Sequence, residues 1–103
     1  MMLDRTFRAL ADPTRRQILA LLRSEDRAAG DLAAHFDMTF ASVSHHLQVL
    51  RDADLVLTRR DGQRVIYSLN TTVFQDALQH LLDIAPGPGA RKSRRRSEGK
   101  SDA

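Results

Sequence analysis

Residues 39–53 read TFASVSHHLQVLRDA, and this stretch decides the fold. At about 100° per residue, Val43, Leu47 and Leu50 fall on one side of a helix. Thr39 is a good N-cap for that helix, because its side-chain oxygen can accept a hydrogen bond from an unpaired amide. The opposite side carries small or hydrogen-bonding residues and no carboxylate until the last turn: Ala41, Ser44, His45 and Gln48. The stretch therefore predicts an amphipathic helix whose polar side is free to meet a partner.

The hydrophobic period changes directly after this helix. Residues 55–60 and 64–69 are rich in Val, Ile, Leu and Tyr, which favours strands. Asp61-Gly62 between them is a strong signal for a hairpin turn. The tip of the predicted hairpin carries three arginines: Arg59, Arg60 and Arg64.

The segments on either side are predicted to be helical. An aspartate can cap free amides and a proline suits the first helical position, so a helix begins at Asp12-Pro13. The other predicted segments are a helix over 3–11, a polar break at 24–27, a short helix over 30–36, and a last helix from a cap at Asn70 or Thr71 to about residue 85. The order is α-α-α-α-β-β-α, a mainly α (α+β) fold.

Two short helices joined by a tight turn at Asp37-Met38 and followed by a hairpin are typical of a winged helix-turn-helix. The second helix of such a motif enters the major groove of DNA, where serine, glutamine and imidazole groups can read base edges and alanine allows approach to a thymine methyl. A basic wing contacts phosphates or the minor groove. Two plainer alternatives are a solvated helix face and a charged edge that discourages strand aggregation.

For four further residues near these elements, the sequence indicates a position and a kind of partner. Arg15 and Arg16 stand in the first turn of the second helix, where they oppose its dipole, so a phosphate or a carboxylate should compensate them. His46 lies near the apolar edge of its helix and is predicted to be structural. Ser42 lies off the outward arc, where it meets a phosphate or nothing.

The last helix has an apolar side too broad for one small domain to cover. Phe74, Leu78, Leu81, Leu82 and Ala85 form one stripe, which Val73, Ala77 and Ile84 widen to about half the circumference. The first helix also offers Leu3 and Phe7. We therefore expect a homodimer built from the terminal helices. Two-fold symmetry would then place the two recognition helices about 34–36 Å apart.

The charge of the chain is unevenly distributed. The 103 residues carry a net charge of +3, but residues 86–103 alone hold six basic and two acidic side chains. This segment follows Pro86-Gly87-Pro88-Gly89 and lacks apolar periodicity, which predicts a disordered basic tail that attracts phosphate nonspecifically. Residues 1–85 are expected to form the single folded domain.

Composition also argues against several classes of protein. The chain has no cysteine, so disulfides, thiolate metal sites and cysteine nucleophiles are excluded. No apolar run approaches the ~18 residues of a membrane span, and the N-terminus lacks a signal-peptide pattern, so we expect a cytoplasmic protein that is not membrane-embedded. Ser44 and His45 are helix neighbours that do not face each other, and no catalytic motif is present. We therefore expect neither an enzyme nor a cofactor.

Three motifs together resemble the ArsR-type bacterial repressors over about residues 3–85. They are FRALADPTRRQIL at 7–19, SVSHHL at 42–47 followed by Leu50-Arg51 and the wing, and IYSLNTTVFQD at 66–76. The third is similar to an autorepressor subgroup that lacks the metal site. The resemblance implies a homodimeric repressor that binds an imperfect palindrome in double-stranded DNA, often in its own promoter.

The resemblance also implies which residues contact DNA. Family base contacts map to Phe40, Ala41, Ser44 and His45. Many relatives carry a polar residue in place of Phe40, which is expected to pack against a base methyl or the sugar instead. The full predicted set is Phe40, Ala41, Ser42, Ser44, His45, Gln48, Arg51, Arg59, Arg60 and Arg64.

Two regulatory alternatives stay open: a metal- or ligand-responsive sensor, and a regulator sequestered by a partner protein. Family metal sensors use cysteines on the third helix, where this chain has RAAGDL at 27–32, or paired ligands on the last helix. Only Asp76, His80 and Asp83 are candidate ligands there, and a solvated polar face is the favoured interpretation of these three residues.

Overall fold

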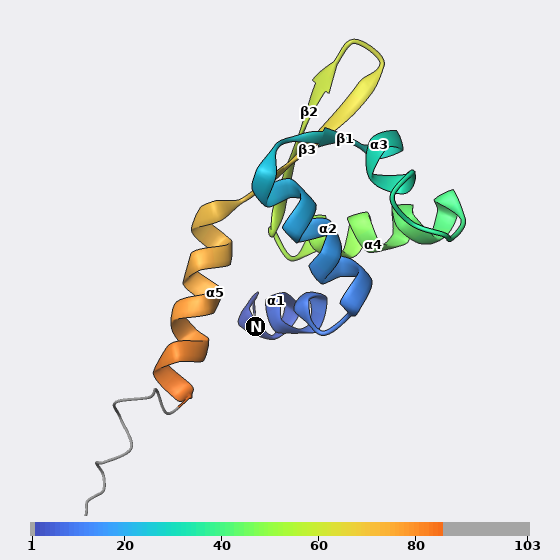
Figure 1. Ribbon diagram of the computed structural model, residues 1–103. Coiled ribbons are helices and arrows are strands. Elements are labelled where there is room, and N and C mark those ends of the chain that lie inside the picture. Colours follow the sequence, from blue (N-terminus) through green and yellow to red (C-terminus); the bar gives the residue numbers. More distant parts are fainter. Residues whose placement is uncertain (1, 86–103) are drawn as a thin grey trace, which may run out of the picture.

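The computed structural model describes residues 2–85, with side chains from Asp4 onward. The elements are α1 (Met2–Leu10), α2 (Pro13–Ser24), β1 (Arg27–Ala28), α3 (Ala29–Ala33), α4 (Phe40–Asp52), β2 (Val56–Asp61), β3 (Arg64–Leu69) and α5 (Thr71–Ile84) (Figure 1). The mainly α prediction with a hairpin between the last two helices is confirmed. The predicted tail at 86–103 lies outside the described residues.

Side-chain caps start three of the helices at the predicted places. The Asp12 carboxylate accepts a hydrogen bond from the amide of Arg15 at 3.1 Å, and the Thr39 hydroxyl accepts one from the amide of Ser42 at 3.1 Å. Asn70 caps α5 by accepting from the amide of Val73 at 3.4 Å, which decides between the two predicted caps. Each cap satisfies an amide that has no partner within its own helix.

The core lies where α2, α3, α4 and the start of the hairpin meet. The largest of the fully buried side chains lie there: Ile18, Leu32, Val43, Leu47, Leu50 and Leu55. The predicted apolar sides of α2 and α4 thus face inward. The third helix is shorter than expected, because α3 ends at Ala33, but Phe36 still packs against the core from the following turn.

The sheet contains one strand that the sequence did not reveal. Its order is β1-β3-β2, all antiparallel, and β1 pairs Arg27 with Tyr67 and Ala28 with Ile66. A two-residue strand is too short to show a period, so this stretch was predicted only as part of a polar break. The first strand of the hairpin also begins and ends one residue later than predicted, at Val56 and Asp61. Asp61 pairs with Arg64, and Gly62, with φ of 66°, begins a two-residue loop.

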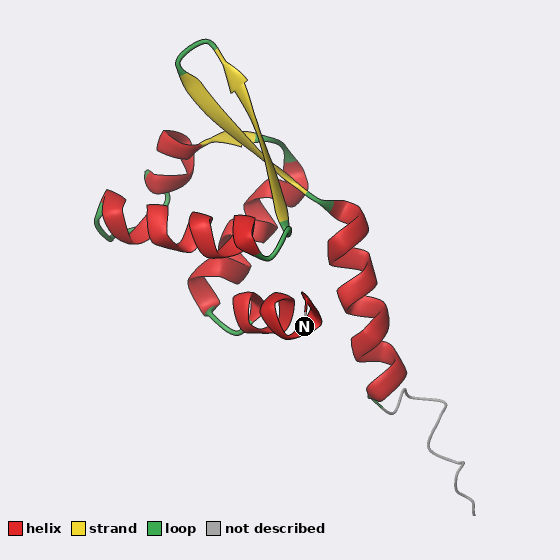
Figure 2. Ribbon diagram, turned by 180° about the vertical axis from the view of Figure 1, so that it is seen from behind, coloured by secondary structure: helices red, strands yellow, loops and turns green. Residues whose placement is uncertain are grey.

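The elements divide the molecule into a helical body, a wing and one outlying helix. The β2–β3 hairpin projects beyond the body, while α5 stands beside it on the side away from α3 (Figures 1 and 2). The polar side of α4 and the apolar side of α5 therefore lie on different parts of the molecular surface.

Candidate nucleic-acid interface

The N-terminus of α4 is an exposed helix end. Thr39 caps it and also donates a hydrogen bond from its hydroxyl to the Ser42 hydroxyl at 3.0 Å. No acidic residue stands in the first turn, so the partial positive charge of the helix end is not neutralised there. Phe40 opens the helix with 59% of its surface exposed. A helix end of this kind suits a phosphate oxygen.

The predicted reading face of α4 points to solvent. Ala41, His45 and Gln48 are exposed and Ser44 is half-buried, while Val43 is on the buried side. The Gln48 amide donates to the Asp52 carboxylate at 2.8 Å, an exposed pair on the last turns of the helix. Ser42 and Arg51 are exposed as well. Of the α4 residues that the sequence predicts to contact DNA, Ser44 is half-buried and the others are exposed to solvent.

Two ion pairs join the wing to the helical body. Arg59 reaches Asp26, and Arg64 reaches Asp31 on α3, both at 2.8 Å. The second pair ties the wing tip to the helix that precedes the reading helix. Exposed pairs of this kind contribute only about 0–1 kcal/mol, so a phosphate can replace the carboxylate at small cost.

Arg60 differs from the other two wing arginines. It is exposed at the edge of β2 and makes no ion pair within residues 2–85. Its guanidinium is therefore the most readily available of the three for a phosphate.

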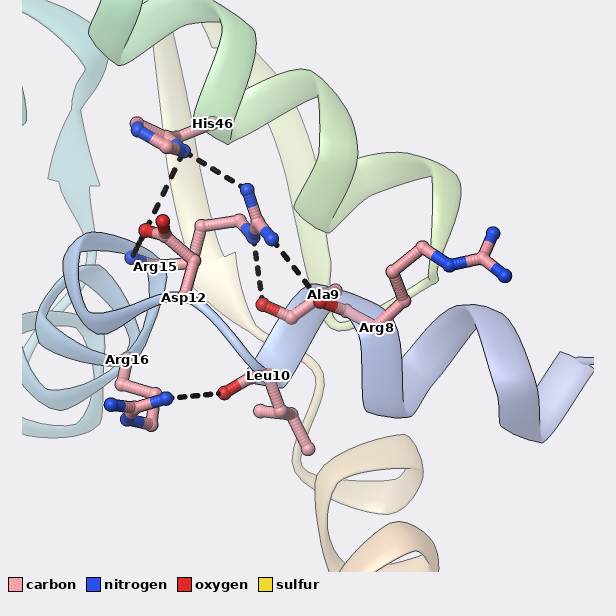
Figure 3. A network of polar contacts seen from close by, with 7 residues as sticks. All are labelled: Arg8, Ala9, Leu10, Asp12, Arg15, Arg16 and His46. Atoms are coloured by element: carbon pink, nitrogen blue, oxygen red, sulfur yellow. Dashed lines mark hydrogen bonds and ion pairs between the residues drawn. The ribbon is translucent and has the colours of Figure 1, made fainter.

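The Asp12 carboxylate, one of the two predicted kinds of partner, interacts electrostatically with Arg15, and both arginine side chains also donate to backbone carbonyls of α1. The Arg15 side chain donates to the carbonyl oxygens of Ala9 at 2.7 Å and Arg8 at 3.1 Å, and Arg16 donates to that of Leu10 at 2.8 Å (Figure 3). These are the last carbonyls of α1, the negative end of its dipole, so they compensate the two cations. The signal was in the sequence: only Ala11 and Asp12 separate the two helices.

His46, which the sequence predicts to be structural, is partly buried beside Arg15. Its Nδ1 atom is 3.1 Å from Arg15 Nη1 and 3.8 Å from an oxygen of Asp12 (Figure 3). Burial acts to raise the pKa of the Asp12 carboxyl. Hydrogen bonds from the amides of Arg15 and Thr14, with the charge of Arg15 and that of His46 when its ring is protonated, outweigh it and lower that pKa below its ordinary value. Asp12 is thus held as a carboxylate beside α4.

The predicted dimer residues do not all share one environment. Phe74 and Phe7 are half-buried, and Phe74 packs against the core of its own chain. The side chain of Leu3 lies outside the described part of the structure. Four large hydrophobic residues of α5 are exposed: Leu78 by 47%, Leu81 by 45%, Leu82 by 60% and Ile84 by 77%. Leu78 and Leu81 also line an open groove of about 510 Å³ between α5 and α2. The apolar side of α5 is thus only partly covered within residues 2–85: its C-terminal half, from Leu78 to Ile84, exposes these large side chains.

The candidate metal ligands of α5 make local hydrogen bonds. His80 Nδ1 donates to the carbonyl of Asp76 at 2.9 Å, and Asp83 accepts from Gln79 at 2.9 Å. Within residues 2–85 no three histidine or carboxylate side chains are grouped closely enough to hold a metal ion. In the same residues, no helix is both long and apolar enough to cross a membrane.

Comparisons with known proteins agree with the geometry. A family model described as bacterial regulatory protein, arsR family, matches residues 12–58. The transcriptional repressor SdpR of Bacillus subtilis is 47% identical over 82 residues, which cover 80% of this chain and 91% of that protein. An ArsR-like transcriptional regulator from Rhodococcus sp. superposes with a TM-score of 0.72 at 28% identity, covering 81% of this chain and 78% of the other.

A second solved structure has the same architecture. It is the homodimeric winged helix-turn-helix DNA-binding domain from Mycobacterium bovis, with a TM-score of 0.67 at 32% identity, covering 80% of this chain and 78% of that one. The predicted fold and the predicted family are both confirmed. By its sequence and its winged helix-turn-helix fold, the chain belongs to the ArsR family of bacterial regulatory proteins.

Proposed function

We propose that the protein is a transcriptional repressor that binds palindromic DNA as a homodimer. The α4 helix lies in the major groove, and the wing at 58–65 lies on the backbone or in the minor groove. The observation that carries this proposal is the polar, carboxylate-free start of α4, exposed beside a wing that Arg64 ties to α3. SdpR is itself a transcriptional repressor, and the structure from M. bovis is a homodimeric DNA-binding domain.

Each residue of the predicted DNA-contacting set then has a role. Ser44, His45 and Gln48 can hydrogen-bond to base edges, and Ala41 can approach a thymine methyl. Phe40 packs against a base methyl or a sugar. The remaining members of the set contact phosphates: Ser42, Arg51, Arg59, Arg60 and Arg64.

The dimer forms through α5 together with α1. The apolar surface of α5 formed by Leu78, Leu81 and Leu82 is exposed, which is unusual for a helix that contacts only its own chain. A second copy would cover them and leave both α4 helices outward. Sequestration of the dimer by a regulatory partner protein, and control by an organic ligand, are further proposals for its regulation.

Competition binding tests the proposal. Fluorescence anisotropy would compare DNA from upstream of the protein's own gene with a shuffled sequence of equal length and composition. We expect the native sequence to bind at least about 10³-fold more tightly at physiological salt. Equal affinity for the two DNAs would reject sequence-specific recognition. Specific binding only to another promoter would reject autorepression but would still support a sequence-specific repressor.

A further inference from the structure

Two ties join α1 to the reading helix α4. At the far end, Arg5 donates from Nη1 to the carbonyl oxygen of Asp52, the last residue of α4, at 3.2 Å. At the near end, Arg15 joins the final carbonyls of α1 to His46, in the middle of α4 (Figure 3). We call Arg5, Arg15 and His46 the α1–α4 brace. Because two points are fixed, α4 cannot rotate against α1 without breaking a hydrogen bond.

Arg15 uses the shape of its guanidinium at the near end. Nε donates to Ala9, Nη2 to Arg8, and Nη1 faces His46 Nδ1, at 2.7, 3.1 and 3.1 Å. A planar fork with nitrogens in fixed directions can bind three acceptors at once, whereas the single nitrogen of lysine cannot span them. Two of the acceptors are backbone atoms of α1, so the contact orients the helix itself and not a mobile side chain.

His46 must be the acceptor in this contact, because arginine has only donors. Its Nδ1 therefore carries a lone pair, and in the neutral ring the proton is on Nε2. The charged or titratable groups that face the ring are Arg15, Asp12 at 3.8 Å, and His45, whose ring centre is 5.9 Å away. His45 is exposed on the reading face, directly adjacent to a residue fixed by the brace.

We propose that Arg15 and His46 are positioning residues that fix the half-site spacing at which the protein binds DNA. This inference rests on the proposed function, in which α1 belongs to the dimer contact and α4 reads the bases. The brace then sets the angle between the dimer contact and each reading helix, and so the separation of the two helices. Moving a half-site by one base pair shifts it by about 3.4 Å, which a rigid brace cannot follow.

The test uses a series of palindromic operators whose half-sites are closer or further apart by single base pairs. Kd would be measured by anisotropy for the wild-type protein, Arg15→Gln and the control Arg16→Gln. Arg16 also donates to a carbonyl of α1, but it is not hydrogen-bonded to α4. We expect wild type and R16Q to keep one preferred spacing. In R15Q the preference should fall by about tenfold, the loss typical of one charge-assisted hydrogen bond.

A pair of variants at His46 separates positioning from packing. His46→Asn keeps an acceptor close to the position of Nδ1, while His46→Leu keeps apolar bulk without one. We expect H46N to retain the spacing preference and H46L to lose it. The double variant R15Q/H46L should be no worse than R15Q alone, because both changes break the same contact. If R15Q does not fold, Arg15→Lys replaces it in the cycle.

The possible results separate this inference from the proposed function. If R15Q and H46L weaken binding equally at every spacing, their role is only structural and the inference is wrong. Wild-type protein that binds the palindrome but tolerates every spacing overturns it too. Wild-type protein with no preference for any DNA sequence contradicts the proposed function itself, and the positioning role with it.

Discussion

The helices α4 and α5 are nearly equal in length, at 13 and 14 residues, and both start at a side-chain cap. They differ in what they bury. Val43, Leu47 and Leu50 of α4 are inside the core, whereas α5 has Ala77 as its one buried residue and exposes leucines instead. Apart from the exposed Phe40 at its start, the apolar side of α4 packs within one chain, so its polar side is available for DNA. The apolar side of α5 is only partly covered, so it requires a second surface.

The same substitution in the two helices gives the largest contrast. Leu47→Ala should lower the free energy of unfolding by about 2–5 kcal/mol, because it leaves a cavity at a fully buried site. Leu82→Ala, at an exposed site, should change it by about 0.5 kcal/mol or less when measured in dilute, monomeric protein. Chemical denaturation at several protein concentrations would measure both. Equal losses at low concentration would show that α5 is stabilised within its own chain.

A charge on the apolar side of α5 tests whether that side is the dimer contact. Leu81→Glu would place a carboxylate in the interface and should give monomers in analytical ultracentrifugation. Operator affinity should fall by about 10²-fold or more, because each half-site is then bound separately. The control is Thr72→Glu, which adds the same charge at an exposed position away from the leucines. A dimeric L81E with normal operator affinity would move the interface elsewhere.

On α4, loss of a reading side chain should affect specificity and not assembly. His45→Ala or Ser44→Ala should cost about 1–3 kcal/mol on the operator and little on unrelated DNA. Competition with single-base operator variants would show which position loses its preference. Uniform weakening on all sequences would instead place these residues at phosphates.

Asp12 lies beside α4, and its carboxylate makes the free energy of unfolding depend on pH. Its pKa in the folded protein is below the ordinary 3.8, so the carboxylate stabilises the fold above that pH, and this contribution is lost as pH falls through the folded-state pKa. Asp12→Asn keeps a good N-cap without the charge, and should cost about 0.5–1 kcal/mol at neutral pH. The difference between the two proteins should vanish in strong acid. A difference in stability that is the same at every pH would show that the geometry of the cap, and not its charge, causes the difference.

The smallest effect is expected at the wing. Arg60→Gln should weaken binding to all DNA sequences alike and reduce the slope of log K against log salt by about 0.9. Arg64→Gln should do the same, and also free Asp31 of its ion pair. An unchanged salt slope for both variants would place the wing away from the phosphates.

Local features were predictable from the sequence, and contacts between distant segments were not. The cap at Thr39 and the apolar side of α4 depend only on spacing within one helix. The pairs of Arg59 with Asp26 and Arg64 with Asp31 join residues 33 positions apart, which no local pattern predicts. The contact of Arg15 with His46, 31 positions further along the chain, is nonlocal in the same way.

The central claim is that two copies of α4, held at a fixed separation by the dimer, read one operator. Hydroxyl-radical footprinting on the native upstream DNA, with the bound stoichiometry measured on the same complex, tests this most directly. The account predicts one dimer and two protected segments centred about 10–10.5 base pairs apart. A single protected segment bound by a monomer, or even protection without sequence preference, would contradict it.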